Sequence, residues 1–547
     1  MKRPIASLVV ACLTVASLAA CTKVSTETGG AGGNSWTIHG VLRWANNAEP
    51  DNLNPVIGNQ QVEVDLSMFW AGYLLNWTDD GKFIGELATE EPTLKNGGIS
   101  ADGLSFTYHL RKGVLWQDGK PFTADDVIFT YQAIMNKDNN VSSRVGYDLI
   151  TGIDKKDDHT IVVHIKQKWA PFVASFFTMS GTPFPILPKH LLGQLPNINH
   201  ADYNNKPIGT GPFQIVSYEK GSLIKFVANP HYWRGAPKLK EIDYHIIPDE
   251  NTLLTQMKTH EIDFQYNASA AHYPELQQIQ GVQLYKTPFT QYGQLGFNTK
   301  VPALSDKRVR QALAYATDTQ ELIHDVSHDL YVKGDSDQPA FLWAHNAHVK
   351  QYPYDVAMAG KLLDQAGWTM GSDGYRSKNG KRLTISITGS TGRKDAEKIE
   401  LLVQNQWKKV GVDLTVKNYI PPQLFASYGA GGILQRDKFE VGNYSWVNGV
   451  DPDNSTLWMC DQFPPNGQNT YQICDPELDA QEKIALTEYD PVKRKAAYDK
   501  IQDILADQEP MIVIWYVSRL DAANSDFKGY KPAHAVTTFW NPWEYSI

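Results

Sequence analysis

The stretch from Phe439 to Cys474 sets the strongest limit on what this chain can fold into. Apolar side chains alternate over its first eight residues, which predicts a strand. Gly449 and the Asp451-Pro452 pair then end that strand. The loop that follows runs from Cys460 to Cys474, and these two cysteines could tie its ends together. A strand end rich in aromatic residues, beside a loop closed in this way, forms a rigid wall with free backbone polar groups. Such a wall suits the capture of a ligand.

Elsewhere in the second half of the chain, helical and strand-like patterns alternate. Helical spacing of apolar residues is found over Asp306–Asp325, Asp355–Gly367, Asp395–Val410 and Pro491–Gln508. Strand patterns cover Leu383–Thr388, Val412–Val416 and Met511–Val517. This alternation predicts an α/β fold in which helices flank a sheet. The full length of 547 residues is enough for roughly three to four domain-sized units.

The first residues of the chain indicate export. Met1-Lys2-Arg3 is a short basic start, and the apolar run after it is too short to span a membrane. Small residues before Cys21 match a lipoprotein signal, in which this cysteine carries the lipid and residues 1–20 are removed. An ordinary secretory leader is the alternative. Residues 21–35 are rich in Thr, Ser and Gly and are expected to form a flexible tether.

The remaining cysteines and the charge fit a protein outside the cytoplasm. Cys460 and Cys474 are the pair left after the leader and the lipid site, and we expect them to form a disulfide. A two-cysteine metal site is the alternative, but no companion ligands stand at metal spacing. The formal net charge is −9, which argues against a nucleic-acid partner.

A series of short motifs resembles one known family. The block DGLSFTYHLRKGVLWQDGKPFTADDVIFTY, over residues 102–131, carries the strongest likeness. It is followed in order by PIGTGPF at 207–213, NPHYW at 229–233, GQLGFNTK at 293–300, VRQALAYATDTQELI at 309–323, AGKLLDQAGW at 359–368 and SWVNGVDPDN at 445–454. Together they cover nearly the whole chain after the tether. The sequence therefore resembles the bacterial extracellular solute-binding proteins of family 5, which include peptide-binding lipoproteins of ABC transporters.

The resemblance implies a two-lobed periplasmic-binding-protein fold, type II and cluster C-like, with an extra inserted domain and a hinge. Strands crossing between the lobes would lie near Tyr292–Asn298 and Met511–Val517. The expected division is a discontinuous domain I of residues 36–65, 191–287 and 516–547, an inserted domain II of residues 66–190, and a domain III of residues 288–515.

The resemblance also implies the function and the ligand-binding residues. The chain would be a monomeric, membrane-anchored receptor that encloses an extended oligopeptide by hinge closure and delivers it to ABC permease subunits, on the outer face of a cell membrane or in a periplasm. The family's ligand-pairing strand corresponds to Tyr444, Ser445 and Trp446, and a segment of the other lobe corresponds to Asn59, Gln60 and Gln61.

One position departs from the pattern of the family's dipeptide and oligopeptide binders. Those proteins often carry an Asp shortly after the tryptophan, and it pairs with the ligand's α-ammonium. Here Asn448 stands near that place, and the nearest carboxylate is Asp451, for which a role in forming the Asp-Pro turn is favoured over ligand binding. An amide is a weaker acceptor than a carboxylate for an ammonium group. This substitution argues against strict recognition of a peptide N-terminus and favours longer peptides or another ligand.

Three alternatives stay open at the level of sequence. The same fold could bind an oligosaccharide, which stacking Trp and Tyr residues would favour, or a nickel chelate or haem. The pairs His324 with His328 and His345 with His348 would suit metal, although surface histidines are the commoner explanation. A secreted hydrolase is a further alternative, but the sequence offers no set of residues that could act as nucleophile and base. We therefore expect that the protein is not an enzyme and that it has no cofactor and no metal site.

Overall fold

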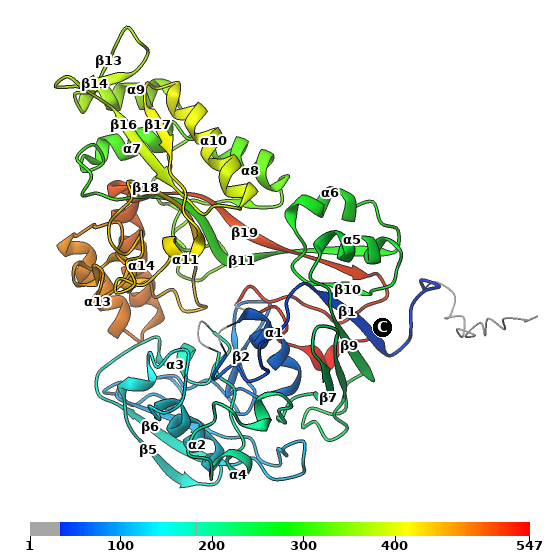
Figure 1. The fold of residues 1–547 in the computed structure, drawn as a ribbon. Helices are drawn as coiled ribbons and strands as arrows, with labels where there is room; N and C mark the ends of the chain where they lie inside the picture. Colours follow the sequence, from blue (N-terminus) through cyan, green and yellow to red (C-terminus); the bar gives the residue numbers. More distant parts are fainter. Residues whose placement is uncertain (1–32, 59, 181–182, 536) are drawn as a thin grey trace, which may run out of the picture.

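The computed structural model describes residues 33–58, 60–180, 183–535 and 537–547. The leader, Cys21, most of the tether and Asn59 lie outside the described residues. The described chain is a mixed α/β structure built on one large sheet (Figure 1). This is the fold class expected from the sequence.

The large sheet has 11 strands in the order β17-β16-β18-β11-β19-β10-β1-β9-β8-β7, with β12 paired to β19. Its strands are β1 (Val41–Asn46), β7 (Phe213–Glu219), β8 (Leu223–Ala228), β9 (Glu241–Ile246), β10 (Phe264–Gln265), β11 (Val282–Phe297), β12 (Val332–Lys333), β16 (Thr384–Thr388), β17 (Asp413–Val416), β18 (Val441–Val447) and β19 (Met511–Asn524). Strand β1 pairs parallel with β9 and β10, β16 pairs parallel with β17 and β18, and the remaining pairs are antiparallel.

Strands β11 and β19 join the two halves of the molecule. We call residues 33–281 with 525–547 the first lobe and residues 298–510 the second lobe. The pairing of β11 with β19 is irregular between Pro288 and Tyr292 and again after Gly293, where the strands pass from one lobe to the other (Figure 1). The sequence predicted only the second-lobe ends of these strands. The remainder carries polar residues such as Lys286 and Arg519, which interrupt the apolar pattern.

The first lobe adds two small sheets and most of the shorter helices. Its further elements are β2 (Leu75–Trp77), β3 (Phe83–Gly85), β4 (Ser105–His109), β5 (Ile150–Asp157), β6 (Thr160–Ile165), α1 (Gln61–Trp70), α2 (Ala124–Met135), α3 (Phe172–Ser175), α4 (Lys189–Leu192), α5 (Glu250–Lys258) and α6 (Tyr273–Leu276). Thr123 and Asp126 cap the start of helix α2. The Thr123 side chain accepts from the Asp125 N–H, and Asp126 accepts from the Thr123 N–H. A continuous core that includes Trp44, Phe69 and many other buried aromatics holds this lobe together.

The second lobe packs helices around its half of the sheet. Its further elements are α7 (Lys307–Tyr315), α8 (Thr319–Ser327), α9 (Val356–Gln365), α10 (Lys394–Lys408), α11 (Pro421–Leu424), α12 (Ser455–Trp458), α13 (Pro476–Thr487), α14 (Pro491–Gln508), β13 (Thr369–Met370), β14 (Arg376–Lys378) and β15 (Lys381–Arg382). The single helix predicted over Asp306–Asp325 is wrong, because two helices occupy this range. The break comes before Asp318, whose carboxylate accepts from the N–H groups of Gln320 and Glu321 and so starts α8.

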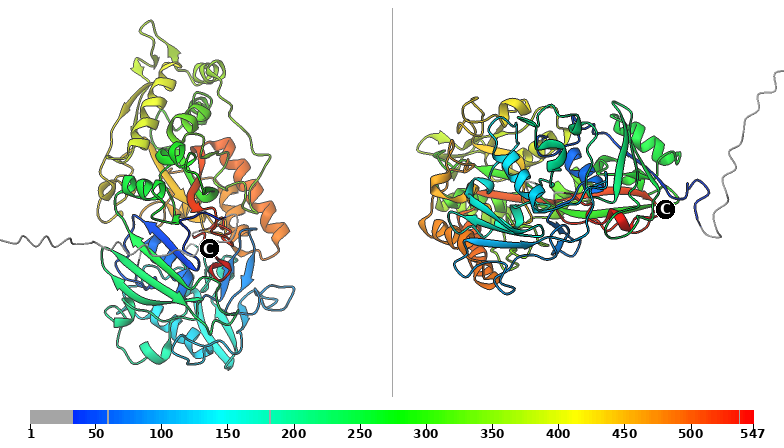
Figure 2. Two further views of the ribbon diagram at one scale, coloured as in Figure 1. Left: turned by 90° about the vertical axis from the view of Figure 1, so that its right-hand side faces the viewer. Right: turned by 90° about the horizontal axis from the view of Figure 1, so that it is seen from below.

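The two lobes form an elongated molecule, seen along two further directions in Figure 2. Helices α13 and α14 form their own core around Trp458 and Tyr471, on the side of the second lobe that turns toward β5, β6 and α3 (Figure 1). No helix among the described residues is long and apolar enough to cross a membrane. The exact bounds of three separate domains stay a prediction.

Candidate ligand-binding site

Strand β18 has a free edge between the lobes. On one side it pairs with β11 along its whole length. At one end of this pairing the Asn298 N–H donates to the Glu440 carbonyl oxygen at 2.9 Å, and at the other end the Asn448 N–H donates to the Thr290 carbonyl oxygen at 2.8 Å. Backbone groups alternate sides in an antiparallel pair, so even-numbered residues of β18 face β11 and odd-numbered ones face away. On that far side β16 reaches only Val441 and Gly442. Within the described residues, the backbones of Ser445 and Val447 therefore face an unpaired edge.

A small pocket of about 140 Å³ lies against this edge. Its lining includes Tyr444, Ser445 and Trp446, the three β18 residues that the family resemblance implies. Their contact with a ligand stays a prediction. Phe425 closes another side and is 52% exposed, and Val447 next to the pocket is 48% exposed. Exposed apolar side chains beside an open strand edge suit an extended chain that carries its own side chains.

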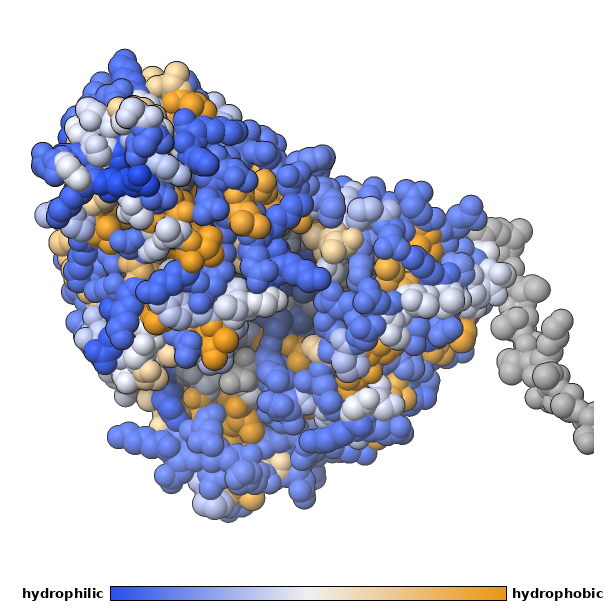
Figure 3. Space-filling model, turned by 45° about the horizontal axis from the view of Figure 1, so that its top comes forward, coloured by the Kyte–Doolittle hydropathy of each residue, from blue (hydrophilic) through white to orange (hydrophobic). Residues whose placement is uncertain are grey.

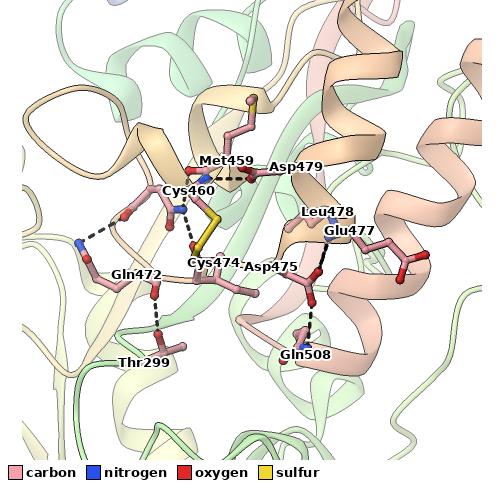
Figure 4. Close-up of a disulfide and its surroundings, with 12 residues drawn as sticks. Thr299, Met459, Cys460, Gln472, Cys474, Asp475, Glu477, Leu478, Asp479 and Gln508 are labelled. Atoms are coloured by element: carbon pink, nitrogen blue, oxygen red, sulfur yellow. Dashed lines mark hydrogen bonds between the residues drawn. A yellow bond between two sulfur atoms is a disulfide. The ribbon is translucent and has the colours of Figure 1, made fainter.

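The loop closed by the disulfide supplies a further wall of this pocket. Cys460 and Cys474 are bonded, as expected, and the backbone N–H of Cys460 donates to Asp479 on α13 at 2.9 Å (Figure 4). Gln468 and Thr470, both within the loop, line the pocket. The loop is thus fastened to α13 while it faces the free edge of β18.

Asn448 does not present its side chain to the space between the lobes. It is 2% exposed, and its Nδ2 donates to the Asp337 carbonyl oxygen at 2.7 Å. The Asp337 carboxylate in turn accepts from Asn454 at 2.9 Å and from the Trp458 indole at 3.2 Å. Burial raises the pKa of Asp337, and these donors oppose that rise. The turn after β18 is therefore held from inside the second lobe.

The Asp451 carboxylate is paired with a basic side chain. Its two carboxylate oxygens accept from the two terminal nitrogens of Arg494, each at 2.7 Å, and both side chains are largely buried. Arg494 also donates to the Ala485 carbonyl oxygen at 2.8 Å. This bidentate pair links the Asp-Pro turn to α14. Its charge is already balanced within the protein.

The candidate residues of the first lobe lie at the start of α1. Glu63 accepts from the Gln60 N–H at 3.0 Å, and Gln61 donates to Asp65 at 3.0 Å. Gln61 is exposed, whereas Asp65 is buried, and its burial raises the pKa of the carboxyl group to about 6. Asn59 precedes these residues and lies outside the part described. Ligand contact by Asn59, Gln60 and Gln61 stays a prediction.

A much larger cavity, about 950 Å³, lies between the lobes beyond the end of β18. The molecular surface is visibly hollowed between the two lobes (Figure 3). The first lobe contributes Trp77 and Phe83, and the second contributes Trp343, Val450 and the Asp451–Arg494 pair. The volume falls in the range of small-molecule and peptide sites.

Metal ligation finds no support in the part of the chain that is described. No group of three or more His, Cys, Asp or Glu side chains there is arranged to hold an ion. His324 bonds instead to Asp329 at 2.9 Å, and the neighbouring carboxylate raises the pKa of the imidazole.

Comparison with known proteins identifies the family of this chain. Residues 82–467 match the model of the bacterial extracellular solute-binding proteins, family 5 (middle region). The chain belongs to this family. Its members are solute-binding proteins of transport systems, and the two-lobed α/β architecture described above is theirs.

The family-5 relatives cover most of the chain. The oligopeptide-binding protein AppA of Bacillus subtilis is 27% identical over 503 residues, covering 88% of this chain and 87% of the relative. Its structure with a nonapeptide superposes with a TM-score of 0.71 at 25% identity, covering 92% of this chain and 98% of AppA. A dipeptide-binding protein of Escherichia coli is 27% identical over 519 residues, with 90% and 92% covered. NikZ of Campylobacter jejuni, solved with Ni(L-His), has a TM-score of 0.74 at 25% identity, with 93% and 100% covered.

Sequence reasoning missed the large cavity of this family-5 protein. Its walls come from residues near 77–99, 170–174, 343, 450 and 488–494, which no single motif joins. Trp343 offered a weak signal, because it is a large aromatic residue in a segment without regular periodicity.

Proposed function

We propose that this protein is the receptor of an ABC importer, which captures oligopeptides in an extended conformation between its lobes and delivers them to membrane permease subunits. The observation that carries the proposal is the free edge of β18 at Ser445 and Val447. A peptide added there would form a further strand of the large sheet.

Backbone pairing explains how such a receptor accepts many sequences. Each outward-facing residue of β18 offers one N–H and one C=O, and every peptide carries the complementary groups. Side chains of the bound peptide would then alternate between the two faces of the edge. In the proposed complex Tyr444 and Trp446 form the wall beneath the ligand, and Gln60 and Gln61 approach it from the first lobe. A contact from Asn59, which lies outside the described residues, stays a prediction.

The positions of Asn448 and Asp451 support recognition that does not depend on a carboxylate at the end of β18. Asn448 bonds within the second lobe, and Asp451 is neutralised by Arg494. Breaking that bidentate pair to bind an ammonium group would leave the Arg494 guanidinium buried and unpaired, which is costly. In our proposal these two residues shape the end of the groove and do not anchor a peptide terminus.

Enclosure of the ligand would use the two strands that join the lobes. The irregular pairing of β11 with β19 leaves few regular hydrogen bonds at the crossing, so a small rotation there would open the groove. The expected role is binding and transfer without a covalent step, by a monomer that needs no cofactor.

Anchoring by a lipid on Cys21 completes the proposal. The first described residues are fastened to the first lobe, where the Asn34 side chain donates to Gly281 at 3.0 Å and to Asn524 at 2.7 Å. A tether from Cys21 would therefore hold the first lobe near the membrane and leave the groove accessible. Labelling with a radioactive fatty acid, compared between the wild type and Cys21→Ala, tests this part.

The ligand itself is tested by native mass spectrometry of the full chain in mild detergent, followed by denaturation and identification of the released mass. Peptides of mixed sequence and narrow length are expected, since backbone pairing selects length over sequence. A single sugar, nickel chelate or haem as the released species would overturn the peptide assignment and leave the family assignment intact.

A further inference from the structure

The large cavity between the lobes, which we call the chamber, has an aromatic lining that comes from both sides. Trp77 and Phe83 of the first lobe pack edge to face, with ring centroids 4.8 Å apart. Opposite them in the lining is Trp343 of the second lobe, which is 39% exposed although it is a large apolar residue. An exposed tryptophan inside a cavity of about 950 Å³ offers a flat surface on which a ligand group can stack.

One acidic group in the chamber lacks a partner. Glu91 lines the chamber and is half-buried, and its carboxylate has no hydrogen bond or ion pair with any described residue. Burial raises the pKa of the Glu91 carboxyl group, and no basic side chain among the described residues opposes that rise. The Asp451–Arg494 pair in the same lining is already neutral. Two lysines, Lys82 and Lys95, also line the chamber, and Lys82 pairs with Asp80. The Glu91 carboxylate is therefore an acceptor in the lining that a cationic group of a ligand can use.

The chamber adjoins the free edge of β18. Val450 and Asp451 line it, only three and four residues beyond Val447, where the strand ends. An extended chain advances about 3.3 Å per residue, so a peptide paired at Ser445 and Val447 would reach the chamber within about three to four further residues.

We propose that the chamber binds the end segment of a long peptide, stacking its bulky apolar side chains on the aromatic walls and pairing a cationic group of the peptide with Glu91. This inference rests on the proposed function, because it needs a peptide on the β18 edge. The cationic group is an ammonium or guanidinium, from either the peptide's α-amino end or a lysine or arginine side chain. The first lobe thus contributes a specificity element to a site whose backbone pairing lies in the second lobe.

The first test compares Glu91→Gln with Glu90→Gln in the full chain, by calorimetric titration with synthetic peptides. Glu90 is the exposed neighbour and does not line the chamber, so its substitution is the matched control. For a peptide of about eight residues with a free amine and an aromatic end, E91Q is expected to weaken binding about tenfold, and E90Q to leave it unchanged. An acetylated peptide without lysine or arginine should lose affinity for the wild type and show no E91Q effect.

The same titrations identify the source of the cation. Acetylated peptides that carry a lysine at the end keep the Glu91 dependence if a side chain is recognised, and lose it if the α-ammonium is. Equal effects of E91Q and E90Q on every peptide would overturn the role of Glu91.

The second test fills the chamber. Leu94 lines it and is 45% exposed, so Leu94→Trp places bulk in the chamber without disturbing the core. Long peptides are expected to bind at least about tenfold more weakly to L94W, while blocked peptides of about three to four residues, which fit along β18, bind as to the wild type. Unchanged binding of long peptides would overturn the chamber assignment. Failure of the wild type to bind short and long peptides alike would instead overturn the proposed function.

Discussion

The hydroxyl of Tyr489, in the second lobe, donates a hydrogen bond of 2.9 Å to the carbonyl oxygen of Gly103, in the first lobe. The same hydroxyl accepts from the Trp169 N–H at 3.2 Å, and the Ala170 N–H donates to Leu486 at 2.7 Å. Gly103 has a φ of +70°, and a Cβ at this position would stand 2.5 Å from the Tyr489 ring. These contacts hold the lobes together far from the β11–β19 crossing.

Tyr489→Phe is therefore expected to favour opening of the lobes. The substitution removes the hydroxyl that makes two hydrogen bonds between the lobes, worth about 1 kcal/mol each, and keeps the ring. Peptide dissociation measured by stopped flow should become about fivefold to thirtyfold faster, because closure retains the ligand. Tyr375→Phe, at a tyrosine far from the lobe contact whose hydroxyl has no described partner, is the control. Equal dissociation rates for the two variants would show that this contact does not hold the closed form.

Because only every second residue of β18 faces the free edge, we expect hydrogen bonds to a bound peptide at alternate positions. Ser445→Pro removes an outward-facing N–H, which an edge strand tolerates, and should weaken peptide binding about tenfold. Ser445→Ala keeps the N–H and should bind like the wild type. Peptides methylated on single backbone nitrogens check the same point without altering the protein. Affinity should fall at every second position, and a uniform fall along the peptide would contradict strand pairing.

The parts of this fold that depend on local sequence were predictable. The disulfide could be predicted from the number of cysteines left after the leader and the lipid site, and from the expected location outside the cytoplasm. Helix α14 could be predicted with its observed bounds, because it begins at a proline and has helical spacing of apolar residues. The length of β11 was not predictable, because its first half carries mixed polar residues that pair across the sheet and not along the chain. The break before α8 was missed because one apolar stripe continues through both helices.

The site was predictable only in its strand. The strand that carries Tyr444, Ser445 and Trp446 was predictable from its alternation and from the turn after it, and these residues line the pocket beside the disulfide-closed loop. Their choice as ligand-binding residues came from the family resemblance and stays a prediction. The internal bonds of Asn448 and Asp451 were hidden, because their partners Asp337 and Arg494 lie far away in sequence. Tertiary packing determines which residues pair in this way, and the periodicity of the sequence carries no information about it.

The disulfide is expected to support both stability and the pocket wall. Replacing Cys460 and Cys474 together by Ala removes the closure of a 14-residue separation and should cost about 3 kcal/mol of folding free energy for the second lobe. Because Gln468 and Thr470 line the pocket, peptide affinity should fall as well. Urea denaturation with and without a reductant checks this, since the reductant should destabilise the wild type and leave the double variant unchanged. A reductant effect of equal size on both would assign the change to another cause.

A second consequence for stability comes from buried carboxyl groups of the first lobe and the joining strand. Asp521 on β19 is fully buried, and burial raises the pKa of its carboxyl group from 3.8 to about 6, although the Asn267 N–H and the Tyr530 hydroxyl donate to it. The pKa of Asp65 is likewise raised to about 6, and that of Glu86 to about 7. At a pH between the unfolded and folded values, the folded protein therefore binds more protons than the unfolded chain. Stability should fall as the pH rises through this window.

Asp521→Asn tests that window at a single group. An amide can keep the bond from the Asn267 N–H and donate to the Tyr530 hydroxyl, which in turn reaches Thr538 at 2.8 Å. The variant should match the wild type near pH 4 and exceed its stability above about pH 7, by up to about 3 kcal/mol, because the asparagine carries no proton to lose. Asp138→Asn, at an exposed position, is the control and should follow the wild-type profile. Urea midpoints measured across the pH range decide the matter. A D521N profile parallel to that of the wild type would mean that Asp521 titrates alike in the folded and unfolded chain.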